Sequence, residues 1–302
     1  MMMPVAIVSH DAGGAEILSS WLNRAHCPAR VVAAGPAEAI FRLKCPQAEF
    51  ISLDTALEKC AWLLCGTGWQ SSFERNAIAH GRANGKKTVA FLDHWVNYRV
   101  RFEEDGRLVL PDEIWVGDVE AERIARSQFD VTPVVLQPNP YFEDLLSEIV
   151  RTQSDLSESS ATKILYVCEP IADHALAQYG DERYCGYTEH DALSYFLTNL
   201  PALGQRIDVI TIRPHPSETA HKYHWAKDLF QLPVQFGGKH TLLEEILSAD
   251  IVVGCESMAM VVGLLANKRV ISSIPSGGRP CQLPHQEIEH MQRLTKDFAH
   301  YD

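Results

Sequence analysis

The sequence lacks the local motifs of several large enzyme classes. Its eight cysteines include no Cys-x-x-Cys pair, which argues against a zinc ribbon or a thioredoxin-type redox site. It contains neither the Gly-x-Ser-x-Gly elbow of many hydrolases nor the Gly-x4-Gly-Lys-Ser/Thr phosphate loop. The pairs His221/His224 and His285/His290 are isolated, so solvated histidines are a better interpretation than metal ligands. We therefore expect no metal site.

Positive charge and long hydrophobic runs are also scarce. The 27 Lys and Arg residues face 39 Asp and Glu, and the net charge of −12 argues against a general nucleic-acid binder. No run approaches the ~20 apolar residues of a membrane span, and the start MMMPVAIVSHDAGG lacks the basic segment of a signal peptide. We expect a cytoplasmic protein with reduced thiols. Docking on the inner face of a membrane and homo-oligomerisation are left open.

Short apolar runs alternate with helical patterns along the chain. This alternation predicts an α/β protein with parallel, doubly wound sheets. The polar stretch RTQSDLSESSAT, residues 151–162, predicts a linker between two Rossmann-like domains that face a central cleft, residues 1–155 and 156–302. A surface loop inside one domain is the alternative. The expected strands are 5–9, 30–34, 50–53, 61–65, 88–92, 113–116, 133–136, 163–170, 208–212, 234–236, 250–254 and 269–274. The expected helices are 15–24, 37–43, 71–84, 191–200, 241–248, 257–266 and a polar one at 286–301.

The stretch TIRPHPSE ends an apolar strand on an arginine and holds a histidine between two prolines. Ligands of open α/β sheets bind beyond the carboxyl ends of the strands. The guanidinium of Arg213 suits phosphate oxygens, and His215 can donate to a phosphate or protonate a leaving group. We expect an anion site here, with a rigid, solvated turn as the alternative.

A second loop of this kind follows the strand at 250–254. A helix that starts near Ser257 would offer free N–H groups and a hydroxyl to an anion. Glu256 can accept the two hydroxyl groups of a ribose. A serine cap with an acidic first turn is the alternative. We expect this loop to lie one sheet position from the Arg213 loop.

The first strand leads into SHDAGGAE, which carries two candidate bases and two glycines. His10 and Asp11 stand at the strand tip, and Gly13 and Gly14 allow a close approach of the backbone to a ligand. A glycine turn with Asp11 as a helix cap is the alternative. The loop CGTGWQSSFE reads Gly-x-Gly-x-x-Ser, which is weak evidence for dinucleotide binding.

The segment FLDHWVNYRVRFEEDG mixes aromatic and hydrogen-bonding side chains. Such a mixture suits a sugar, which stacks on a ring and forms hydrogen bonds at its rim. Buried aromatic residues with satisfied polar tips are the alternative. The candidate acceptor-binding residues of this segment are Asp93, His94, Trp95 and Tyr98.

The two α/β halves, the RPHP turn and the stretch ADIVVGCESMAMVVGLLANKRVISSIP resemble a GT-B glycosyltransferase. They are most similar to capsule and surface-polysaccharide enzymes with cytidine-linked donors, namely bacterial sialyltransferases and CDP-glycerol glycerophosphotransferases. The architecture covers nearly the whole chain, whereas the motifs cover about 30 residues. Those families often show two adjacent hydroxyl residues where this chain has Glu256-Ser257. The fold also includes UDP-sugar 2-epimerases, so it does not fix the reaction.

The resemblance implies a nucleotide-activated donor, linked to CMP, CDP or UDP, as substrate and no separate cofactor. Arg213, His215, Glu256, Ser257 and Met258 would bind this donor, and the N-terminal half would hold a glycan or lipid-linked acceptor. Asp11, or else His10, would be the general base, and His215 would assist the leaving nucleotide. The Glu-x7-Glu pattern of retaining enzymes would need an acid at Leu264, so we expect inversion without an essential metal. A 2-epimerase and a non-catalytic nucleotide-sugar-binding protein are the alternatives.

Overall fold

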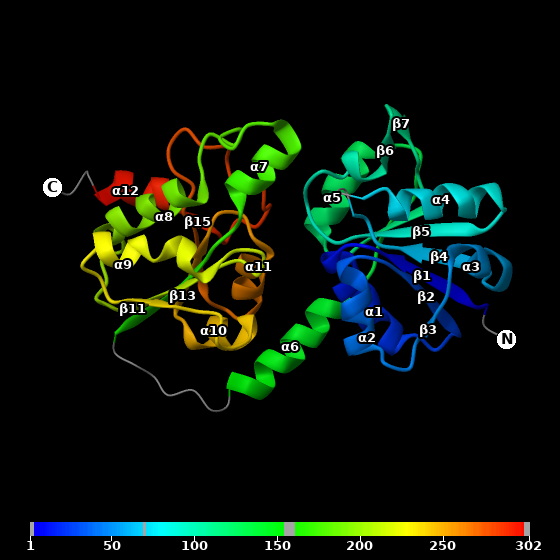
Figure 1. Cartoon of the computed structure of the whole chain (residues 1–302), viewed down its shortest axis with the longest axis horizontal. Helices are drawn as coiled ribbons and strands as arrows, with labels where there is room; N and C mark the ends of the chain where they lie inside the picture. Colours follow the sequence, from blue (N-terminus) through cyan, green and yellow to red (C-terminus); the bar gives the residue numbers. More distant parts are fainter. Residues whose placement is uncertain (1–2, 69–70, 154–160, 299–302) are drawn as a thin grey trace. The chain divides into compact units, whose positions relative to one another are not determined.

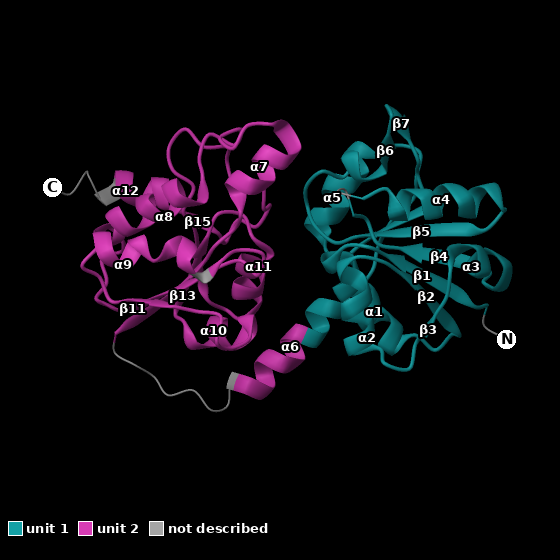
Figure 2. Cartoon of the chain, in the orientation of Figure 1, with its two compact units in different colours: residues 1–144 teal, residues 145–302 magenta. Residues whose placement is uncertain are grey.

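The computed structural model describes residues 3–68, 71–153 and 161–298. The chain divides into two compact units, residues 1–144 and 145–302, which are teal and magenta in Figure 2. The predicted linker falls mostly on residues 154–160, which lie outside the described residues. Its described ends belong to helix α6 (Pro140–Gln153) and strand β10 (Thr162–Val167). The domain limits and the cleft between the halves stay predictions.

Unit 1 contains a parallel sheet with the strand order β3-β2-β1-β4-β5-β8-β9. Figure 1 labels its strands β1 to β5. The chain adds β2 and β3 on one side of β1 and then β4 on the other, so the topological switch point lies between β1 and β4. The strands are β1 (Val5–Ser9), β2 (Ala29–Ala33), β3 (Glu49–Phe50), β4 (Trp62–Cys65), β5 (Lys87–Leu92), β8 (Glu113–Val116) and β9 (Val134–Leu136). A small antiparallel pair, β6 (Glu103–Glu104) and β7 (Arg107–Leu108), lies outside this sheet.

Helices cover both faces of this sheet. On one face, Leu18 of α1 and Phe41 of α2 pack on Ile7 and Val89 in the buried core. On the other, α4 contacts β1, β4 and β5. The helical segments are α1 (Ala12–Arg24), α2 (Pro36–Lys44), α3 (Leu53–Lys59), α4 (Phe73–Ala83), η1 (Val100–Phe102) and α5 (Val119–Gln128).

Unit 2 repeats this arrangement with the order β12-β11-β10-β13-β14-β15. Its switch point lies between β10 and β13. Tyr166, Phe196 and Ile212 belong to the core on one face of the sheet, while α10 and α11 contact β10, β13 and β14. The further strands are β11 (Ile207–Arg213), β12 (Val234–Phe236), β13 (Ile251–Gly254), β14 (Arg269–Ser272) and β15 (Glu289–His290). The helical segments are α7 (Ile171–Tyr179), α8 (Glu189–Thr198), η2 (Leu200–Leu203), η3 (Ala220–Tyr223), α9 (Trp225–Leu229), α10 (Leu242–Ser248), α11 (Met258–Leu265) and α12 (Met291–Phe298).

Helices α3, α5, α6 and α7 were not among the expected helices, and two of the expected segments are wrong in part. The strand expected at 50–53 ends at Phe50, because Ser52 caps α3 by accepting a hydrogen bond from the N–H of Thr55 at 3.2 Å. Within the helix expected at 286–301, residues 289–290 instead extend the sheet. There Glu289 forms an ion pair with Arg269 of β14 at 2.7 Å, and α12 begins only at Met291.

Candidate active site

The β1–α1 loop places its two candidate bases side by side at the switch point of unit 1. The Nδ1 atom of His10 lies 3.5 Å from an Asp11 carboxylate oxygen, and both side chains are partly exposed. Asp11 occupies the N-cap position of α1, but its side chain makes no capping hydrogen bond. The carboxylate is therefore not used as a helix cap, which leaves it open to act as a base.

A buried glutamate that carried no role in the sequence prediction holds this loop. Glu74, in the first turn of α4, is 1% exposed, and its Oε1 accepts the backbone N–H of His10 at 2.6 Å. Burial raises the pKa of Glu74, the His10 N–H opposes this rise, and the charge of Asp11 adds to it. Glu74 thus ties the β4–α4 loop to the loop with the candidate bases.

The glycines of these loops pack against the protein itself. A Cβ atom added at Gly13 would collide with the Asp93 carboxylate, and one added at Gly14 would lie 3.2 Å from Cα of Gly66. A Cβ at Gly68 would lie 2.8 Å from Asp11. Close approach between loops explains these glycines, and their predicted contact with an acceptor stays a prediction.

The predicted acceptor residues after β5 are mostly buried. Asp93 forms an ion pair with the buried Arg101 at 2.5 Å, and Arg101 also donates to the backbone oxygen of Thr67 at 2.5 Å. The Nδ1 atom of His94 accepts the backbone N–H of Trp95 at 3.0 Å. The Trp95 indole donates to Asp118 at 2.9 Å.

The aromatic rings of this segment are 5% exposed at Trp95 and 1% at Tyr98. Such burial favours the packing interpretation over stacking on a sugar. Binding of an acceptor by these residues stays a prediction.

In unit 2, Arg213 is held by its own unit. It forms an ion pair with the buried carboxylate of Glu245 at 2.8 Å and donates to the backbone oxygen of His240 at 3.0 Å. The other oxygen of Glu245 accepts the N–H of Gly238 at 2.6 Å. Arg213 therefore fixes the loop after β12. A phosphate bound to Arg213 would share its guanidinium with the carboxylate of Glu245.

The contacts of His215 define its proton-bearing nitrogen. The backbone N–H of Ser217 donates to Nδ1 at 3.2 Å, and the Ser217 hydroxyl lies 2.7 Å from the same atom. A backbone N–H can only donate, so the neutral ring carries its proton on Nε2. Burial lowers the pKa of His215, Glu218 opposes this effect, and His174 adds to it.

A buried charge cluster behind His215 keeps the Arg213–His215 loop in place. Glu218 accepts the N–H of His215 at 3.0 Å, the Lys222 ammonium at 2.8 Å and the Tyr223 hydroxyl at 2.8 Å. Lys222 also pairs with Glu189 of α8. Burial alone would lower the pKa of Lys222, but the hydrogen bonds that its ammonium donates to Glu189 and Glu218 outweigh this effect and raise the pKa.

The β13–α11 loop is also satisfied from within the unit. The Ser257 hydroxyl accepts the N–H of Ala259 at 3.1 Å, as an N-cap serine does. Glu256 forms an ion pair with Arg279 and accepts the N–H of Gln282 at 3.0 Å. The donor roles predicted for Glu256, Ser257 and the adjacent Met258 stay predictions.

The expected spacing of the two donor loops is wrong by one strand. The Arg213 loop follows β11 and the Ser257 loop follows β13, but β10 lies between them in the sheet. The error arose because the chain turns back to the middle of the sheet after β12. Two residues after β10 stands Glu169, whose carboxylate accepts the N–H of Cys255 at 2.8 Å. The only sequence signal for this residue was its place at the end of an apolar run.

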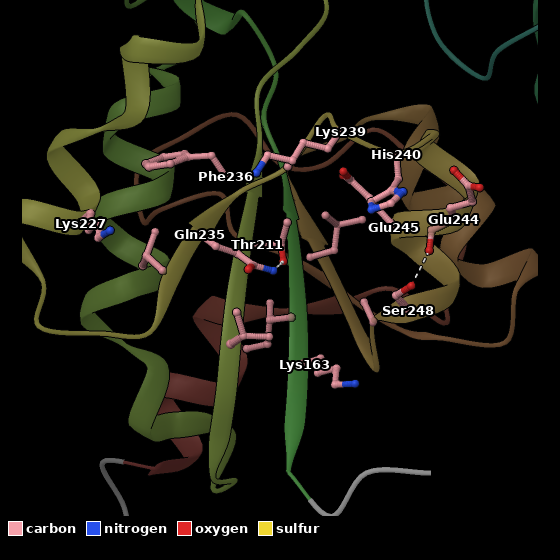
Figure 3. A pocket seen from close by; sticks show the side chains of 16 residues that line it. Lys163, Thr211, Lys227, Gln235, Phe236, Lys239, His240, Glu244, Glu245 and Ser248 are labelled. Atoms are coloured by element: carbon pink, nitrogen blue, oxygen red, sulfur yellow. Dashed lines mark hydrogen bonds between the residues drawn. The ribbon is translucent and has the colours of Figure 1, made fainter. Parts of the chain in front are cut away.

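A separate pocket of about 730 Å³ lies on one face of the unit 2 sheet (Figure 3). Its walls come from β10, β11, β12 and α10, and Lys163, Lys239 and His240 contribute positive or titratable groups. None of the predicted site residues lines it. Among the described residues, no cluster of three or more His, Cys, Asp or Glu could hold a metal ion. No helix within the described ranges has the length and apolar character needed to cross a membrane.

No protein-family model and no curated protein matches this sequence. Solved structures do match. S. aureus MnaA in complex with UDP is 11% identical, with a TM-score of 0.62 over 99% of this chain and 87% of that one. The UDP-GlcNAc 2-epimerase from Methanocaldococcus jannaschii is 8% identical, with a TM-score of 0.64 over 98% and 92%. Acinetobacter baumannii MurG is 10% identical, with a TM-score of 0.53 over 99% and 91%.

The chain has a GT-B glycosyltransferase-like fold. This agrees with the resemblance drawn from the two strand-end motifs. Identities of 8–11% establish the fold and not the reaction.

Proposed function

We propose that this protein is a nucleotide-sugar-dependent glycosyltransferase of polysaccharide or glycoconjugate biosynthesis. The observation that carries the proposal is the state of His215. This side chain stands beyond the carboxyl end of β11 in a GT-B-like fold, and its contact with the Ser217 N–H leaves the proton on Nε2. A fixed Nε2–H donor at a strand end suits a phosphate oxygen that gains charge as the nucleotide leaves.

The donor is assigned to unit 2 and the acceptor to unit 1. His215, the Ser257 loop and the positive charge of Arg213 all belong to the carboxyl edge of one sheet, where ligands of such folds bind. The transferred group would be a sugar or a glycerol-phosphate-like unit. Unit 1 supplies Asp11, whose carboxylate is not used in a helix cap.

The mechanism follows from these roles. Asp11, or else His10, removes the proton from the acceptor hydroxyl as it attacks the donor carbon. The bond from that carbon to the phosphate oxygen breaks, and the configuration of the carbon inverts. His215 donates from Nε2 to the leaving phosphate, and Arg213 adds positive charge. These groups do the work of a metal ion, so the proposal includes no essential metal.

The test compares His215→Gln with His221→Gln, an exposed histidine on the same segment. Release of nucleotide from a donor and an acceptor mixture is followed by chromatography. We expect His215→Gln to lose about 100-fold or more in turnover, as for loss of one hydrogen-bond donor to developing negative charge, and His221→Gln to match wild type. Equal turnover by wild type and His215→Gln would refute the leaving-group role.

A 2-epimerase is the second candidate. The backbone agrees better with two structures whose titles name UDP-GlcNAc or UDP-N-acetylglucosamine 2-epimerases, at TM-scores of 0.64 and 0.63, than with MurG at 0.53. An epimerase needs no acceptor. Proton NMR of a UDP-sugar incubated with the protein alone would show a second sugar isomer if this candidate is correct, and an unchanged sugar if the transferase proposal is correct.

A further inference from the structure

Glu169 stands at the switch point of the unit 2 sheet. It is the second residue after β10, and β10 lies between β11 and β13, where the chain reverses its direction of strand addition. Ligands of open α/β sheets bind in the crevice at such a point. Glu169 therefore occupies the position in unit 2 that the topology reserves for a ligand.

The carboxylate of Glu169 binds backbone amides of the β13–α11 loop, where the sequence analysis predicted a phosphate. Its Oε1 accepts the N–H of Cys255 at 2.8 Å and that of Glu256 at 3.0 Å, and the N–H of Ser257 also contributes. Successive backbone N–H groups that converge on one point form an anion-binding nest. The structure thus shows a carboxyl group of the protein itself in the nest of the β13–α11 loop.

No positive side chain balances this carboxylate among the described residues. A charged group that raises its pKa is Glu256, which is negative and paired with Arg279. Burial raises the pKa of Glu169 to about 7, the N–H groups of Cys255 and Glu256 oppose this rise, and the charge of Glu256 adds to it. Five other titratable side chains interact electrostatically with Glu169. They are Tyr166 and Cys168 at the end of β10, Tyr187 before α8, Cys255 after β13 and Cys281 after β14.

We propose that Glu169 is a donor-site residue that holds the β13–α11 amides before nucleotide binds and takes up one proton when the donor phosphate binds beside it. The proposal rests on the proposed function, because it needs a phosphate at this loop. Two anions that share one nest repel each other. Transfer of one proton from the solvent to the carboxylate removes the repulsion and turns Glu169 into an O–H donor for a phosphate oxygen.

Isothermal titration calorimetry tests this proton uptake. UDP-GlcNAc and a CMP-linked sugar are the probes, because the diphosphate or phosphodiester of each stays ionised between pH 6 and 8.5. Titrations in buffers of different ionisation enthalpy count the protons taken up per nucleotide bound. The variants are Glu169→Gln, which keeps an oxygen acceptor for the amides, and Glu182→Gln, an exposed glutamate of the same unit, as the control.

We expect the wild type and Glu182→Gln to take up close to one proton at pH 8 and to lose affinity about tenfold per pH unit above 7. Glu169→Gln should lack this slope and bind about tenfold more tightly than wild type at pH 8. Because burial lowers the pKa of His215 below its ordinary value, its titration lies below this pH range, and the decisive quantity is the difference between wild type and Glu169→Gln. His215→Gln should keep the proton uptake, which provides a second test if Glu169→Gln does not fold.

The outcomes separate the two proposals. Binding with the same pH slope in wild type and Glu169→Gln would overturn the role of Glu169 and leave the proposed function standing. A slope that is lost in His215→Gln and kept in Glu169→Gln would assign the proton to the histidine and would also overturn it. Absence of binding by any nucleotide-sugar at any pH would remove the proposed function, and this inference with it.

Discussion

At the switch point of each unit, a glutamate accepts backbone N–H groups of a neighbouring loop, but the charged groups near the two sites differ. In unit 1, Glu74 reaches from α4 to the His10 N–H, and in unit 2, Glu169 reaches from the end of β10 to the Cys255 and Glu256 N–H groups. Each glutamate ties together the two loops that border the crevice. In unit 1, the carboxylate of Asp93 forms an ion pair with the buried Arg101. In unit 2, Glu169 has no such cation among the described residues.

This difference indicates different ligands. The Asp11 carboxylate, which is not used in a helix cap, disfavours a phosphate in the crevice of unit 1 and suits the neutral hydroxyl of an acceptor. A crevice with three convergent N–H groups and one carboxylate of raised pKa can accept an anion, because the carboxylate can become neutral. The comparison supports the donor in unit 2 and the acceptor in unit 1.

The largest loss of stability should come from removing Arg101, the buried cation of unit 1. Arg101 is 4% exposed and bonded to Asp93 and the Thr67 backbone, so Arg101→Ala leaves a largely buried carboxylate without its partner. We expect a loss of about 3–5 kcal/mol in the free energy of unfolding, measured by urea denaturation. The control is Arg126→Ala, which breaks an exposed i,i+4 pair with Glu122 and should cost below about 1 kcal/mol. Equal losses for both variants would show that the buried Arg101–Asp93 ion pair contributes no more to stability than an exposed one.

A smaller effect is expected from Glu169, which should make the protein less stable as the pH rises. Its folded-state pKa of about 7 lies above the ordinary value of 4.5, so folded chains keep a proton that unfolded chains release. The stabilisation is complete below pH 4.5 and is lost as the pH rises toward 7. Relative to Glu169→Gln, wild type should lose on the order of 2–3 kcal/mol between pH 5 and pH 8. Parallel stability curves for the two proteins would mean that Glu169 is ionised throughout.

The smallest effect is expected at Glu74. Glu74→Ala removes the carboxylate that accepts the His10 N–H, to which the N–H of Asp11 also contributes, and should cost about 1–2 kcal/mol at pH 7. Glu169→Ala releases at least two N–H groups and should destabilise more under the same conditions. Thermal denaturation of both variants gives the ranking. A larger loss for Glu74→Ala would show that the loop of unit 1 depends more on its glutamate than that of unit 2.

The sequence predicted the strands well because buried parallel strands are nearly continuous apolar runs, as in Ile251–Gly254. It failed where a cap or a pairing between distant residues decides the structure. Ser52 ends one expected strand, and the pairing of residues 289–290 with β14 replaces the start of an expected helix.

The motifs led to His215 and Ser257 because these residues follow strands in recognisable patterns. Glu74, Glu169 and the Glu218–Lys222 pair were missed, because each acts on a loop or helix brought to it by the fold. Glu169 is 86 residues from Cys255. A single acidic residue after a strand carries no signal of such a contact.

The central claim is that this chain binds a nucleotide-sugar through His215 and the β13–α11 loop. A thermal-shift panel of CMP, CDP, UDP, UMP, GDP and NAD⁺ on wild type and His215→Gln tests it most directly. We predict that a pyrimidine nucleotide raises the melting temperature of wild type and has a clearly smaller effect on His215→Gln. Stabilisation by NAD⁺ alone, or equal stabilisation of both proteins by the nucleotide, would contradict the claim.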